Sequence, residues 1–430
     1  MDVFIIQGGT PLTGEVTVSG AKNAALPMMA ATLLANGTST LHQVPDLVDV
    51  STLLKLLESL GCNVTRNRPG VCAIEVQSER HSEAPYDLVR RMRASVCVLG
   101  PLLARRGVAR VSLPGGCNIG HRPIDLHLKG LAALGADIKL TSGYVEARAK
   151  RLTGAVIDLA GPYGSTVTGT CNVMSAATLA HGVTTITSAA QEPEVVALAE
   201  YLNAMGAQIS GQGTSTLIIE GVTSLTGTDF TVIPDRIEAA TLMIAAAITG
   251  GDVTLHNVCL HHLRSVIHLL DQIGVTMLRA DGRTIRIRAA RKLHSAHVIA
   301  APYPNIPSDL QAQLMAFLTL APGTSVIEDR VFPDRFMHCA ELNRMGAQIQ
   351  LQHNRAIIRG VPHLQGAHVM ASDLRASAAL VLAALAAQGE TLIRRIYHLD
   401  RGYESLESKL NTLGGHITRC REDQVAQKAA

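Results

Sequence analysis

The chain has 430 residues, of which 47% are apolar, and its 38 basic and 35 acidic residues give a net charge of +3. That length exceeds one ordinary hydrophobic core and predicts two domains or a repeat array. The balanced charge, without a basic run interleaved with aromatic residues, argues against a nucleic-acid partner. The longest apolar run, 376–387, is shorter than the roughly 18 residues of a membrane span, so we expect no membrane partner either. Eight scattered cysteines without a C-x-x-C pair, and no basic leader segment, indicate reduced thiols in the cytoplasm.

Six similar segments follow one another along the chain, each with an apolar helical run that ends at a glycine and leads into a short strand. Successive glycines lie 74, 71, 68, 72 and 68 residues apart. A regular period of this length indicates one supersecondary unit that is used repeatedly. The glycines are Gly61, Gly135, Gly206, Gly274, Gly346 and Gly414.

Each segment also contains an earlier helix. We expect these first helices over 22–35, 87–105, 170–180, 235–249, 309–320 and 373–388. A glycine near the end of each helix is expected to adopt the left-handed cap conformation before an alternating strand. The second helices precede the periodic glycines, as in 47–60, 123–134 and 403–413, with Pro123 at a first helical position. The cap glycines are Gly37, Gly107, Gly182, Gly251, Gly323 and Gly389.

The fold class follows from these helices and strands together. Helices that are apolar nearly all round, such as 242–248 and 376–387, should lie inside a domain with sheets around them. Six units are too many for one core, so we expect an α/β protein with two similar domains of three units and a cleft between them. No long Pro/Ser linker is present, and the best hinge candidate is 225–229.

Polar and charged residues recur where the expected helices begin. Helix N-termini carry unpaired N–H groups and a partial positive charge, so several of them with adjacent Lys or Arg would bind phosphates and carboxylates. The alternative is that Asp235, Ser308 and Asp373 are only helix N-caps. That explanation does not apply to the cations. The residues at these starts are Lys22, Asn23, Arg122, Asp235, Ser308, Asp309, Asp373, Arg375 and Arg401.

A glycine-rich segment, Leu113-Pro-Gly-Gly-Cys117-Asn-Ile-Gly120-His-Arg122, has the composition of a mobile loop. An unperturbed Cys117, with a pKa of about 8.5, would be mostly protonated at neutral pH and able to donate a proton. Arg122 nearby would lower that pKa and make the thiol more reactive but a poorer acid. The sequence leaves the balance between the two open.

The chain resembles the UDP-N-acetylglucosamine 1-carboxyvinyltransferase family from Met1 to about Arg419. The Gly-Gly-Cys segment separates that family from its sister family, the enolpyruvyl transferases that act on shikimate 3-phosphate. The motifs that carry the resemblance are Ser19-Gly-Ala-Lys22-Asn23-Ala-Ala-Leu-Pro27, Met92-Arg93-Ala-Ser95, Pro114-Gly-Gly-Cys117 through Arg122-Pro-Ile-Asp125-Leu-His127, Pro234-Asp-Arg-Ile-Glu238, Asp309-Leu-Gln-Ala-Gln313, Arg335-Phe-Met-His338, Asp373-Leu-Arg-Ala-Ser377 and Asp400-Arg-Gly-Tyr-Glu404.

The resemblance implies two inside-out α/β barrel domains, each with three βαβαββ repeats, and an active site in the cleft between the domains. Residues 1–21 and 231–430 would form one domain and residues 22–230 the other. The implied reaction joins phosphoenolpyruvate and UDP-N-acetylglucosamine to give the 3-O-enolpyruvyl sugar nucleotide and phosphate, with no cofactor and no metal. It is the first committed step of peptidoglycan synthesis in the cytoplasm, which links it to cell-wall biogenesis, cell shape and cell division.

The resemblance also implies catalytic roles. Cys117 would protonate the methylene carbon of phosphoenolpyruvate, form a covalent adduct with that substrate and be the target of fosfomycin. Asp309 would take the proton of the sugar 3-hydroxyl. Lys22, Arg122 and Arg401 would hold the phosphate of phosphoenolpyruvate.

Further residues are implied to bind substrate. Arg93 would line the pocket, Asn23 would hydrogen-bond substrate, and Arg335 and Arg375 would lie near the carboxylate, with Asp373 in the same motif. Some family members have a lysine in a segment that contacts the nucleotide, whereas 161–169 has none here, which leaves backbone contacts from its middle part. The uridine contacts implied are Arg122, Pro123, Ile124, Asp125 and Leu126, with Val331 beside the sugar nucleotide and Gly164, Ser165, Thr166 and Val167 as the backbone contacts.

Two alternatives remain beside this function. The sister activity on shikimate 3-phosphate is the enzymatic one. A non-catalytic paralogue that binds the sugar nucleotide is the other, and it should have lost Cys117, Asp309 or Arg401, all of which are present.

Overall fold

The structure is a computed structural model that describes residues 1–115, 123–279, 281–289 and 292–424. The chain forms two compact units. Unit 1 contains Met1–Ser19 and the described residues from Pro234 onward, and unit 2 contains the described residues between Gly20 and Ile233. None of the helices in the described ranges combines the length and hydropathy that a bilayer crossing requires.

Unit 2 contains three four-stranded sheets of the same topology. In each, the first two strands are parallel and the remaining neighbours are antiparallel. Unit 2 also contains a two-stranded hairpin, β12 (Ala160–Gly161) and β13 (Gly164–Ser165). The sheet orders are β18 (Asp229–Thr231), β4 (Thr38–His42), β6 (Val71–Val76), β5 (Cys62–Arg68); β7 (Glu83–Ala84), β8 (Val108–Ser112), β10 (Tyr144–Arg148), β9 (Asp137–Thr141); and β11 (Val156–Asp158), β14 (Val183–Thr187), β16 (Thr216–Glu220), β15 (Gln208–Ser210).

Unit 1 repeats the same sheet topology three times, which confirms the repeat that the glycine period predicts. One of its sheets joins both ends of the chain, because β1 lies between β27 and β28, with Phe4 opposite Ile393 on one side and Arg419 on the other. The orders are β26 (His368–Met370), β27 (Glu390–Arg394), β1 (Asp2–Gln7), β28 (His416–Arg421); β2 (Thr13–Thr17), β19 (Asp252–His256), β21 (Ile285–Arg288), β20 (Thr276–Arg279); and β22 (His297–Ala300), β23 (Thr324–Asp329), β25 (Arg355–Arg359), β24 (Gln348–Gln352).

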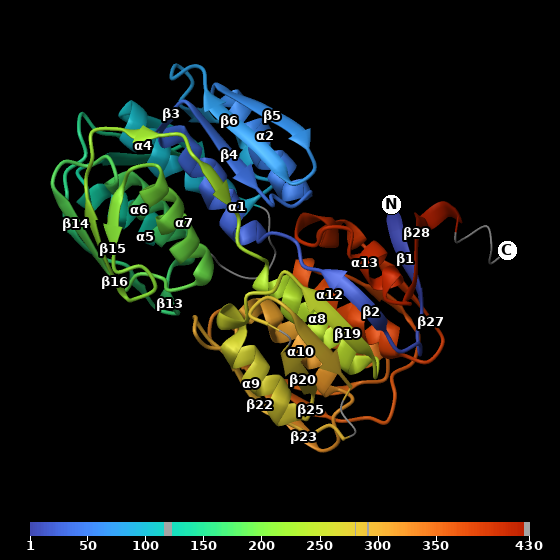
Figure 1. The fold of residues 1–430 in the computed structure, drawn as a ribbon. Coiled ribbons are helices and arrows are strands. Elements are labelled where there is room, and N and C mark those ends of the chain that lie inside the picture. The colour runs from blue at the N-terminus through green and yellow to red at the C-terminus, as the bar shows by residue number, and fades with distance from the viewer. Residues whose placement is uncertain (116–122, 280, 290–291, 425–430) are drawn as a thin grey trace. The chain divides into compact units, whose positions relative to one another are not determined.

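The core of unit 1 is a bundle of three helices that contact one another, α8 (Arg236–Ile248), α10 (Gln311–Leu318) and α12 (Leu374–Ala386). All residues of α8 are buried, and so are the residues from Arg375 to Leu385 of α12, as predicted for helices that are apolar nearly all round. All residues of α10 are buried as well. Figure 1 shows α8, α10 and α12 close together within this unit. The remaining helices, which expose one face, are α9 (Arg264–Ile273), α11 (His338–Arg344) and α13 (Leu406–Thr412), and η3 (Leu260–Leu263), η4 (Ser308–Leu310) and η5 (Ile396–Arg401) are short 3-10 helices.

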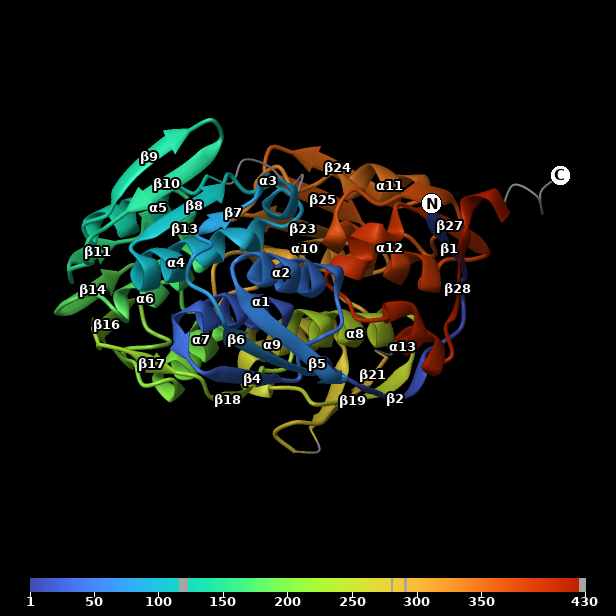
Figure 2. The same ribbon diagram turned by 90° about the horizontal axis from the view of Figure 1, so that it is seen from above.

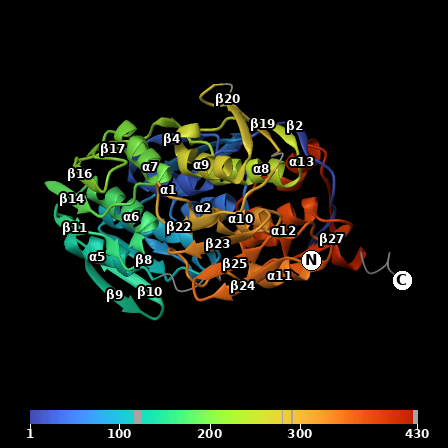
Figure 3. The ribbon, with the colours of Figure 1, turned by 90° about the horizontal axis from the view of Figure 1, so that it is seen from below.

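Unit 2 is built around α1 (Lys22–Ala31), α4 (Leu99–Arg106) and α6 (Val167–Ala177), and α6 contacts both of the others. Helix α5 packs on α6 (Figure 3) and α7 packs on α1 and α6. Strands β8, β10 and β9 lie next to one another in Figure 2, as their pairing requires. The other elements of this unit are α2 (Val48–Ser59), α3 (Tyr86–Val89), α5 (Asp125–Ala133), α7 (Pro193–Ala204), η1 (Thr32–Leu34), η2 (Arg93–Val98), β3 (Ala35–Asn36) and β17 (Leu225–Thr226).

The six periodic glycines all adopt the left-handed conformation, with φ between 88° and 106°, as the pattern predicts. Among the six cap glycines, five have positive φ and Gly251 does not, because Gly250 takes that role instead. A Cβ on Gly251 would lie 2.2 Å from the carbonyl oxygen of Leu12, so this glycine is needed for close backbone approach rather than for a cap.

Three other expectations were wrong. The helix expected over 87–105 is divided into α3, η2 and α4, since Met92 is extended and Pro101 can be accommodated only in the first turn of a new α-helix. Pro123 is not a first helical residue, because α5 begins at Asp125 after a non-helical Ile124. The segment 225–229 is no free hinge, because β17 pairs with β3 and β18 with β4 inside unit 2.

Candidate functional site

Four charged residues of unit 1 form a compact group that we call the Asp309 cluster: Asp309, Arg335, Asp373 and Arg375. Asp309 accepts from Nη1 of Arg335 at 3.0 Å on one carboxylate oxygen and from Nη2 of Arg375 at 2.9 Å on the other. Arg335 also donates to Asp373 at 3.1 Å. Both guanidinium side chains are at most 6% exposed, whereas the Asp309 side chain is 29% exposed. The sequence therefore predicted four residues that the fold brings together.

Local structure explains how each member of the Asp309 cluster is held. Asp309 is the middle residue of η4, which leads directly into α10. Asp373 is the N-cap of α12, where it accepts from the backbone nitrogens of Arg375 and Ala376 at 2.9 and 3.4 Å. The capping explanation and the site explanation of Asp373 are thus compatible, because the same carboxylate oxygen also faces Arg335.

The other two residues considered as N-caps differ. Asp235 caps α8 by accepting from the nitrogens of Ile237 and Glu238. Ser308 does not cap; its hydroxyl donates to Asp329 at 2.6 Å. The other oxygen of Asp329 accepts from the backbone nitrogen of Val331 at 2.9 Å. Asp329 thus links Val331, an expected substrate contact, to the residue that precedes Asp309.

The electrostatics of the Asp309 cluster favour charged carboxylates. Burial raises the pKa of Asp309, but the positive charges of Arg375 and Arg335 outweigh it and hold that pKa well below its usual range. Burial also opposes ionisation of Asp373, and Arg335 again lowers its pKa below the usual value. In this arrangement Asp309 is an ionised and weak base, and it becomes a stronger one only when an arginine leaves it.

Two neighbours of the Asp309 cluster were not predicted as functional. The side-chain amide of Gln313 donates to the backbone carbonyl of Asp309 at 2.9 Å and to the Tyr403 hydroxyl at 3.0 Å, which fixes η4 against α10. His338 is fully buried near Asp373 and Arg335. Burial lowers its pKa to about 4, although the charge of Asp373 raises it, so this imidazole is neutral at physiological pH.

Arg401, expected to hold phosphate, ends η5 in unit 1 and is partly exposed. It lies near His398, whose pKa is lowered first by burial and then by the Arg401 charge. Arg401 has further interactions within the described chain.

Lys22 and Asn23 lie at the start of α1 in unit 2. The Lys22 ammonium is 3.3 Å from a carboxylate oxygen of Asp49 on α2, and both side chains are largely buried. A buried cation beside a carboxylate can also bind an anionic group of a substrate. Asp49 lies 27 residues away, and nothing in the sequence singled it out as the partner.

The expected nucleotide contacts are distributed over three neighbouring segments of unit 2. Arg93, the first residue of η2, donates to the carbonyl oxygen of Pro123 at 2.9 Å, which joins two of the segments. The β12–β13 hairpin, which contains Gly164 and Ser165, lies against Leu126, since a Cβ on Gly161 would be 3.0 Å from that side chain. Thr166 caps α6 by accepting from the nitrogen of Gly169 at 3.2 Å. Ile124 is buried and Asp125 is exposed in the first turn of α5.

Cys117 and Arg122 lie outside the described residues. Their expected roles, proton donor and phosphate ligand, therefore stay predictions. The described part of the preceding segment ends at Gly115, where a Cβ would be 2.6 Å from the carbonyl oxygen of Arg90.

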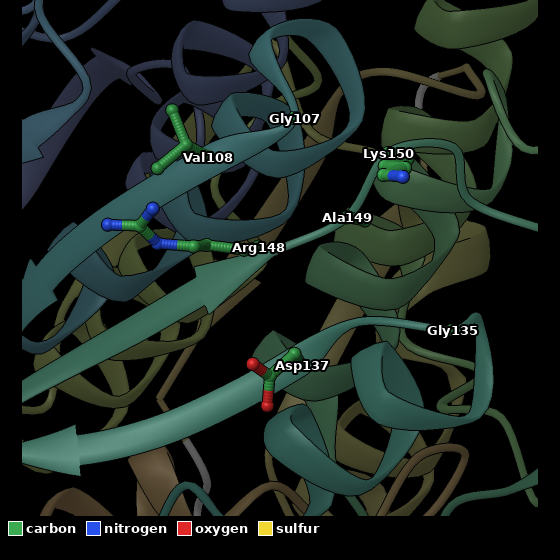
Figure 4. A pocket seen from close by; sticks show the side chains of 7 residues that line it. All are labelled: Gly107, Val108, Gly135, Asp137, Arg148, Ala149 and Lys150. Carbon is green, nitrogen blue, oxygen red and sulfur yellow. The ribbon is translucent and has the colours of Figure 1, made fainter.

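A surface hollow lies at one end of β8, β9 and β10, and Figure 4 shows Arg148 and Asp137 on two of these strands. It contains none of the expected site residues. Its charged side chains are exposed, and it is not part of the candidate site. The residues that line it are Gly107, Val108, Gly135, Asp137, Arg148, Ala149 and Lys150.

Residues 6–410 match the family described as EPSP synthase (3-phosphoshikimate 1-carboxyvinyltransferase). The chain is 53% identical over 421 residues to the UDP-N-acetylglucosamine 1-carboxyvinyltransferase of Myxococcus xanthus, covering 97% of this chain and 99% of that one.

Two solved structures are similar as well. The enolpyruvyl transferase NikO from Streptomyces tendae has a TM-score of 0.89 at 27% identity, covering 97% of this chain and 98% of its own. An EPSP synthase from Acinetobacter baumannii has a TM-score of 0.76 at 22% identity, covering 98% and 100%, and shows the same fold. The two-domain α/β fold expected from the sequence is thereby confirmed.

Proposed function

Because the chain belongs to the enolpyruvyl transferase family, with relatives at about 53% identity that are UDP-N-acetylglucosamine 1-carboxyvinyltransferases, we propose that it transfers the enolpyruvyl group of phosphoenolpyruvate to the 3-hydroxyl of UDP-N-acetylglucosamine. The products are the 3-O-enolpyruvyl sugar nucleotide and inorganic phosphate. On this assignment the protein acts in peptidoglycan synthesis in the cytoplasm, and fosfomycin is its inhibitor through Cys117.

The reaction proceeds by addition and elimination. The sugar 3-oxygen bonds to the carbon that bears the phosphate, while its proton goes to Asp309 and Cys117 gives a proton to the methylene carbon. The tetrahedral intermediate then loses phosphate as its C–O bond breaks, and a proton leaves the new methyl group to restore the double bond. Both steps need a general acid and a general base close to the same carbon atoms.

The anionic groups of phosphoenolpyruvate need fixed cations. We assign its phosphate to Lys22, Arg122 and Arg401, and its carboxylate to Arg335 and Arg375. Preorganised cations in a site that excludes water stabilise the charge that develops on the leaving phosphate and on the carboxylate. Arginine suits the carboxylate because its planar fork can donate two parallel hydrogen bonds.

The observation that carries this proposal is that two arginines form ion pairs with the carboxylate of Asp309. With Arg335 at 3.0 Å and Arg375 at 2.9 Å, its carboxylate is held in the conformation of a salt bridge. A substrate carboxylate that takes either guanidinium removes one stabilising charge and raises the basicity of Asp309. The base strength of Asp309 would then increase only after phosphoenolpyruvate has bound, so Asp309 would stay unprotonated in the free protein.

The sugar nucleotide is assigned to the three joined segments of unit 2, to Asn23 of the same unit, and to two residues of unit 1. Arg93 and the stretch from Pro123 to Leu126 would contact the uridine, and backbone groups of 164–167 the diphosphate. The start of α6 offers N–H groups for a diphosphate without any lysine. Asn23, Val331 and Asp373 complete the proposed contacts.

Phosphate release decides between this activity and the sister activity on shikimate 3-phosphate. We expect phosphoenolpyruvate with UDP-N-acetylglucosamine to give stoichiometric phosphate, and phosphoenolpyruvate with shikimate 3-phosphate to give none. The Asp309→Asn protein is the control for contaminating phosphatase. Phosphate release with shikimate 3-phosphate as acceptor, and none with UDP-N-acetylglucosamine, would reject the proposal. The relatives at 51–53% identity favour the nucleotide substrate.

A further inference from the structure

A buried hydrogen-bond network in unit 2 is centred on the amide of Asn172, which is fully buried in α6. Its Oδ1 accepts from the backbone nitrogen of Gly100 at 2.6 Å. Its Nδ2 donates to the carbonyl oxygen of Val96 at 2.8 Å and lies 3.1 Å from Nδ1 of His127. Because a backbone N–H can only donate, the atom that faces Gly100 must be the amide oxygen, and the orientation of this amide is fixed.

The fixed amide determines the tautomer of His127. Nδ1 of the imidazole faces an N–H donor, so it carries no proton and accepts. The ring proton is therefore on Nε2, which lies 3.2 Å from Oγ1 of Thr168 and donates to it. Burial, and to a lesser degree the charge of Arg93, lower the pKa of His127 to about 3, so the ring stays neutral.

Small residues allow the helices around His127 to approach closely. A Cβ on Gly100 would lie 2.2 Å from the carbonyl oxygen of Asn172, and a Cβ on Gly130 would lie 2.4 Å from Cγ2 of Val173. Helices α4 and α5 therefore both pack on α6 at a distance that larger residues would prevent. The side chains of this network are therefore closely packed and have little space to change conformation.

We propose that His127 is a positioning residue for sugar-nucleotide binding, because its ring holds the start of α5 to the start of α6. It follows Leu126 directly, and its partner Thr168 follows Val167 directly. The two sets of nucleotide contacts, 123–126 and 164–167, are thereby held in one geometry. This inference rests on the proposed function, since it concerns the site for that substrate.

Two isosteric substitutions separate the two bonds of the ring. In His127→Asn the side-chain oxygen replaces Nδ1 as acceptor for Asn172, but nothing reaches Thr168. In His127→Gln the amide nitrogen replaces Nε2 and can donate to Thr168, whereas the acceptor for Asn172 is lost. Affinity for UDP-N-acetylglucosamine is measured by calorimetry, KM and kcat by phosphate release, and stability by thermal unfolding.

We expect His127→Asn to weaken nucleotide affinity and raise KM by roughly tenfold, the size of effect of one buried hydrogen bond, with kcat changed less than about twofold. His127→Gln should keep the affinity for UDP-N-acetylglucosamine within about threefold of the wild-type value. Its loss of thermal stability should be at least as large as that of His127→Asn. Wild-type affinity in His127→Asn would overturn the inference. So would a loss of affinity in both variants that simply follows their loss of stability.

Thr168 supplies an independent test of the same bond. Thr168→Val should reproduce the weaker affinity of His127→Asn, and Thr168→Ser should restore it. The double variant His127→Asn/Thr168→Val should be no worse than either single change, because both remove one interaction. Additive losses would contradict the coupling. Nitrogen chemical shifts of His127 should report a proton on Nε2, and a proton on Nδ1 would also contradict it.

These outcomes can be told apart from failure of the proposed function. If the wild-type protein neither binds UDP-N-acetylglucosamine nor releases phosphate with it, the proposed function fails and the variants are not needed. If the wild-type protein does both and the His127 variants bind as it does, only the positioning role fails.

Discussion

Arg335 and Arg375 approach Asp309 from two sides, so that each oxygen of one carboxylate faces a different guanidinium, at 3.0 and 2.9 Å. The pair of arginines is almost completely buried, and Arg335 also holds the N-cap of α12 through Asp373. A carboxylate in this position has two functions that oppose each other, since it stabilises the fold as an anion and must gain a proton during the reaction. The first predictions address that conflict.

Replacing Asp309 with Asn should abolish phosphate release while UDP-N-acetylglucosamine still binds. The amide keeps the shape of the side chain but cannot accept the proton of the sugar hydroxyl. Arg375 loses the carboxylate that faces it and Arg335 keeps only Asp373, so we also expect a loss of about 2–4 kcal/mol in the free energy of unfolding. Rapid-quench phosphate assays, nucleotide calorimetry and urea denaturation measure the three quantities. A modest change in rate would demote Asp309 to a structural residue.

The protonation of Asp309 should change when one arginine is removed. In the free wild-type protein its carboxyl should not titrate between pH 5 and pH 8, because its pKa is held well below the usual range. Arg335→Gln removes one of the two charges that favour the anion, so the pKa should rise. Carbon NMR of labelled aspartate measures the midpoint of the Asp309 titration, and the spectrum of Asp309→Asn assigns the signal. An unchanged midpoint in Arg335→Gln would show that this arginine does not control Asp309.

The same shift has a consequence for stability. A carboxyl whose pKa is lower in the folded state stabilises the protein above its unfolded pKa, near 3.9, and this contribution disappears as the pH falls through the folded pKa. The ion pairs of Asp309 should therefore contribute fully at pH 5 and be lost only in stronger acid. The difference in unfolding free energy between wild type and Asp309→Asn should be constant from pH 5 to pH 8 and shrink below pH 4. A difference that already shrinks between pH 7 and pH 5 would contradict the low pKa.

Cys117 can be tested without any knowledge of its surroundings. Cys117→Ser should remove most turnover and leave nucleotide affinity unchanged, because a serine hydroxyl is a far weaker acid than a thiol. Cys117→Asp should retain turnover and resist fosfomycin, since a carboxylic acid donates a proton but is not alkylated like a thiol. The activity assay with and without fosfomycin measures both. Normal turnover of the serine variant would exclude Cys117 as the proton donor.

Lys22 and Asp49 offer a test of a buried pair. Lys22→Met should lower the free energy of unfolding by about 3 kcal/mol, because the Asp49 carboxylate remains buried without its cation. The double change Lys22→Met/Asp49→Leu should recover most of that stability but none of the affinity for phosphoenolpyruvate. Denaturation and the KM for phosphoenolpyruvate separate the two effects. Recovery of affinity in the double variant would show that Lys22 has only a structural role.

The close approach of α5 to α6 predicts a steric effect. Gly130→Ala should cost about 1–3 kcal/mol of stability, because the new methyl group would overlap Val173. Val173→Ala provides the matched control, since Gly130→Ala/Val173→Ala should be more stable than the sum of the single effects predicts. Thermal and urea unfolding measure the four proteins. Strict additivity would mean that the two residues do not limit the approach.

Much of the fold was predictable because it depends on local signals that repeat. The glycine period reports a left-handed residue before a strand, and this residue is present in all six units. The helix breaks were missed where two local preferences compete, as at Pro101. The apolar run continues through Pro101, but proline has no backbone N–H to donate in the interior of a helix, so a new helix begins there. The resemblance named the members of the Asp309 cluster, but not their contacts with one another.

The partners of the site residues could not be read from the sequence. Asp49 is 27 residues from Lys22 and Asn172 is 45 residues from His127, and each is an ordinary residue in its own helix. Such pairs depend on which helix faces meet, which is decided by tertiary packing. His127 stood within a motif that carried the family resemblance, but only the fixed amide of Asn172 reveals what its two nitrogens do.

The place of β1 between β27 and β28 has a consequence for biosynthesis. Unit 2 is encoded without interruption, so the ribosome can release it as a foldable body while translation continues. The sheet that contains β1, by contrast, stays incomplete until the last strand has been made. Strand β1 therefore stays without both of its strand partners until β27 and β28 have been synthesised, so this sheet is expected to form after unit 2 has folded.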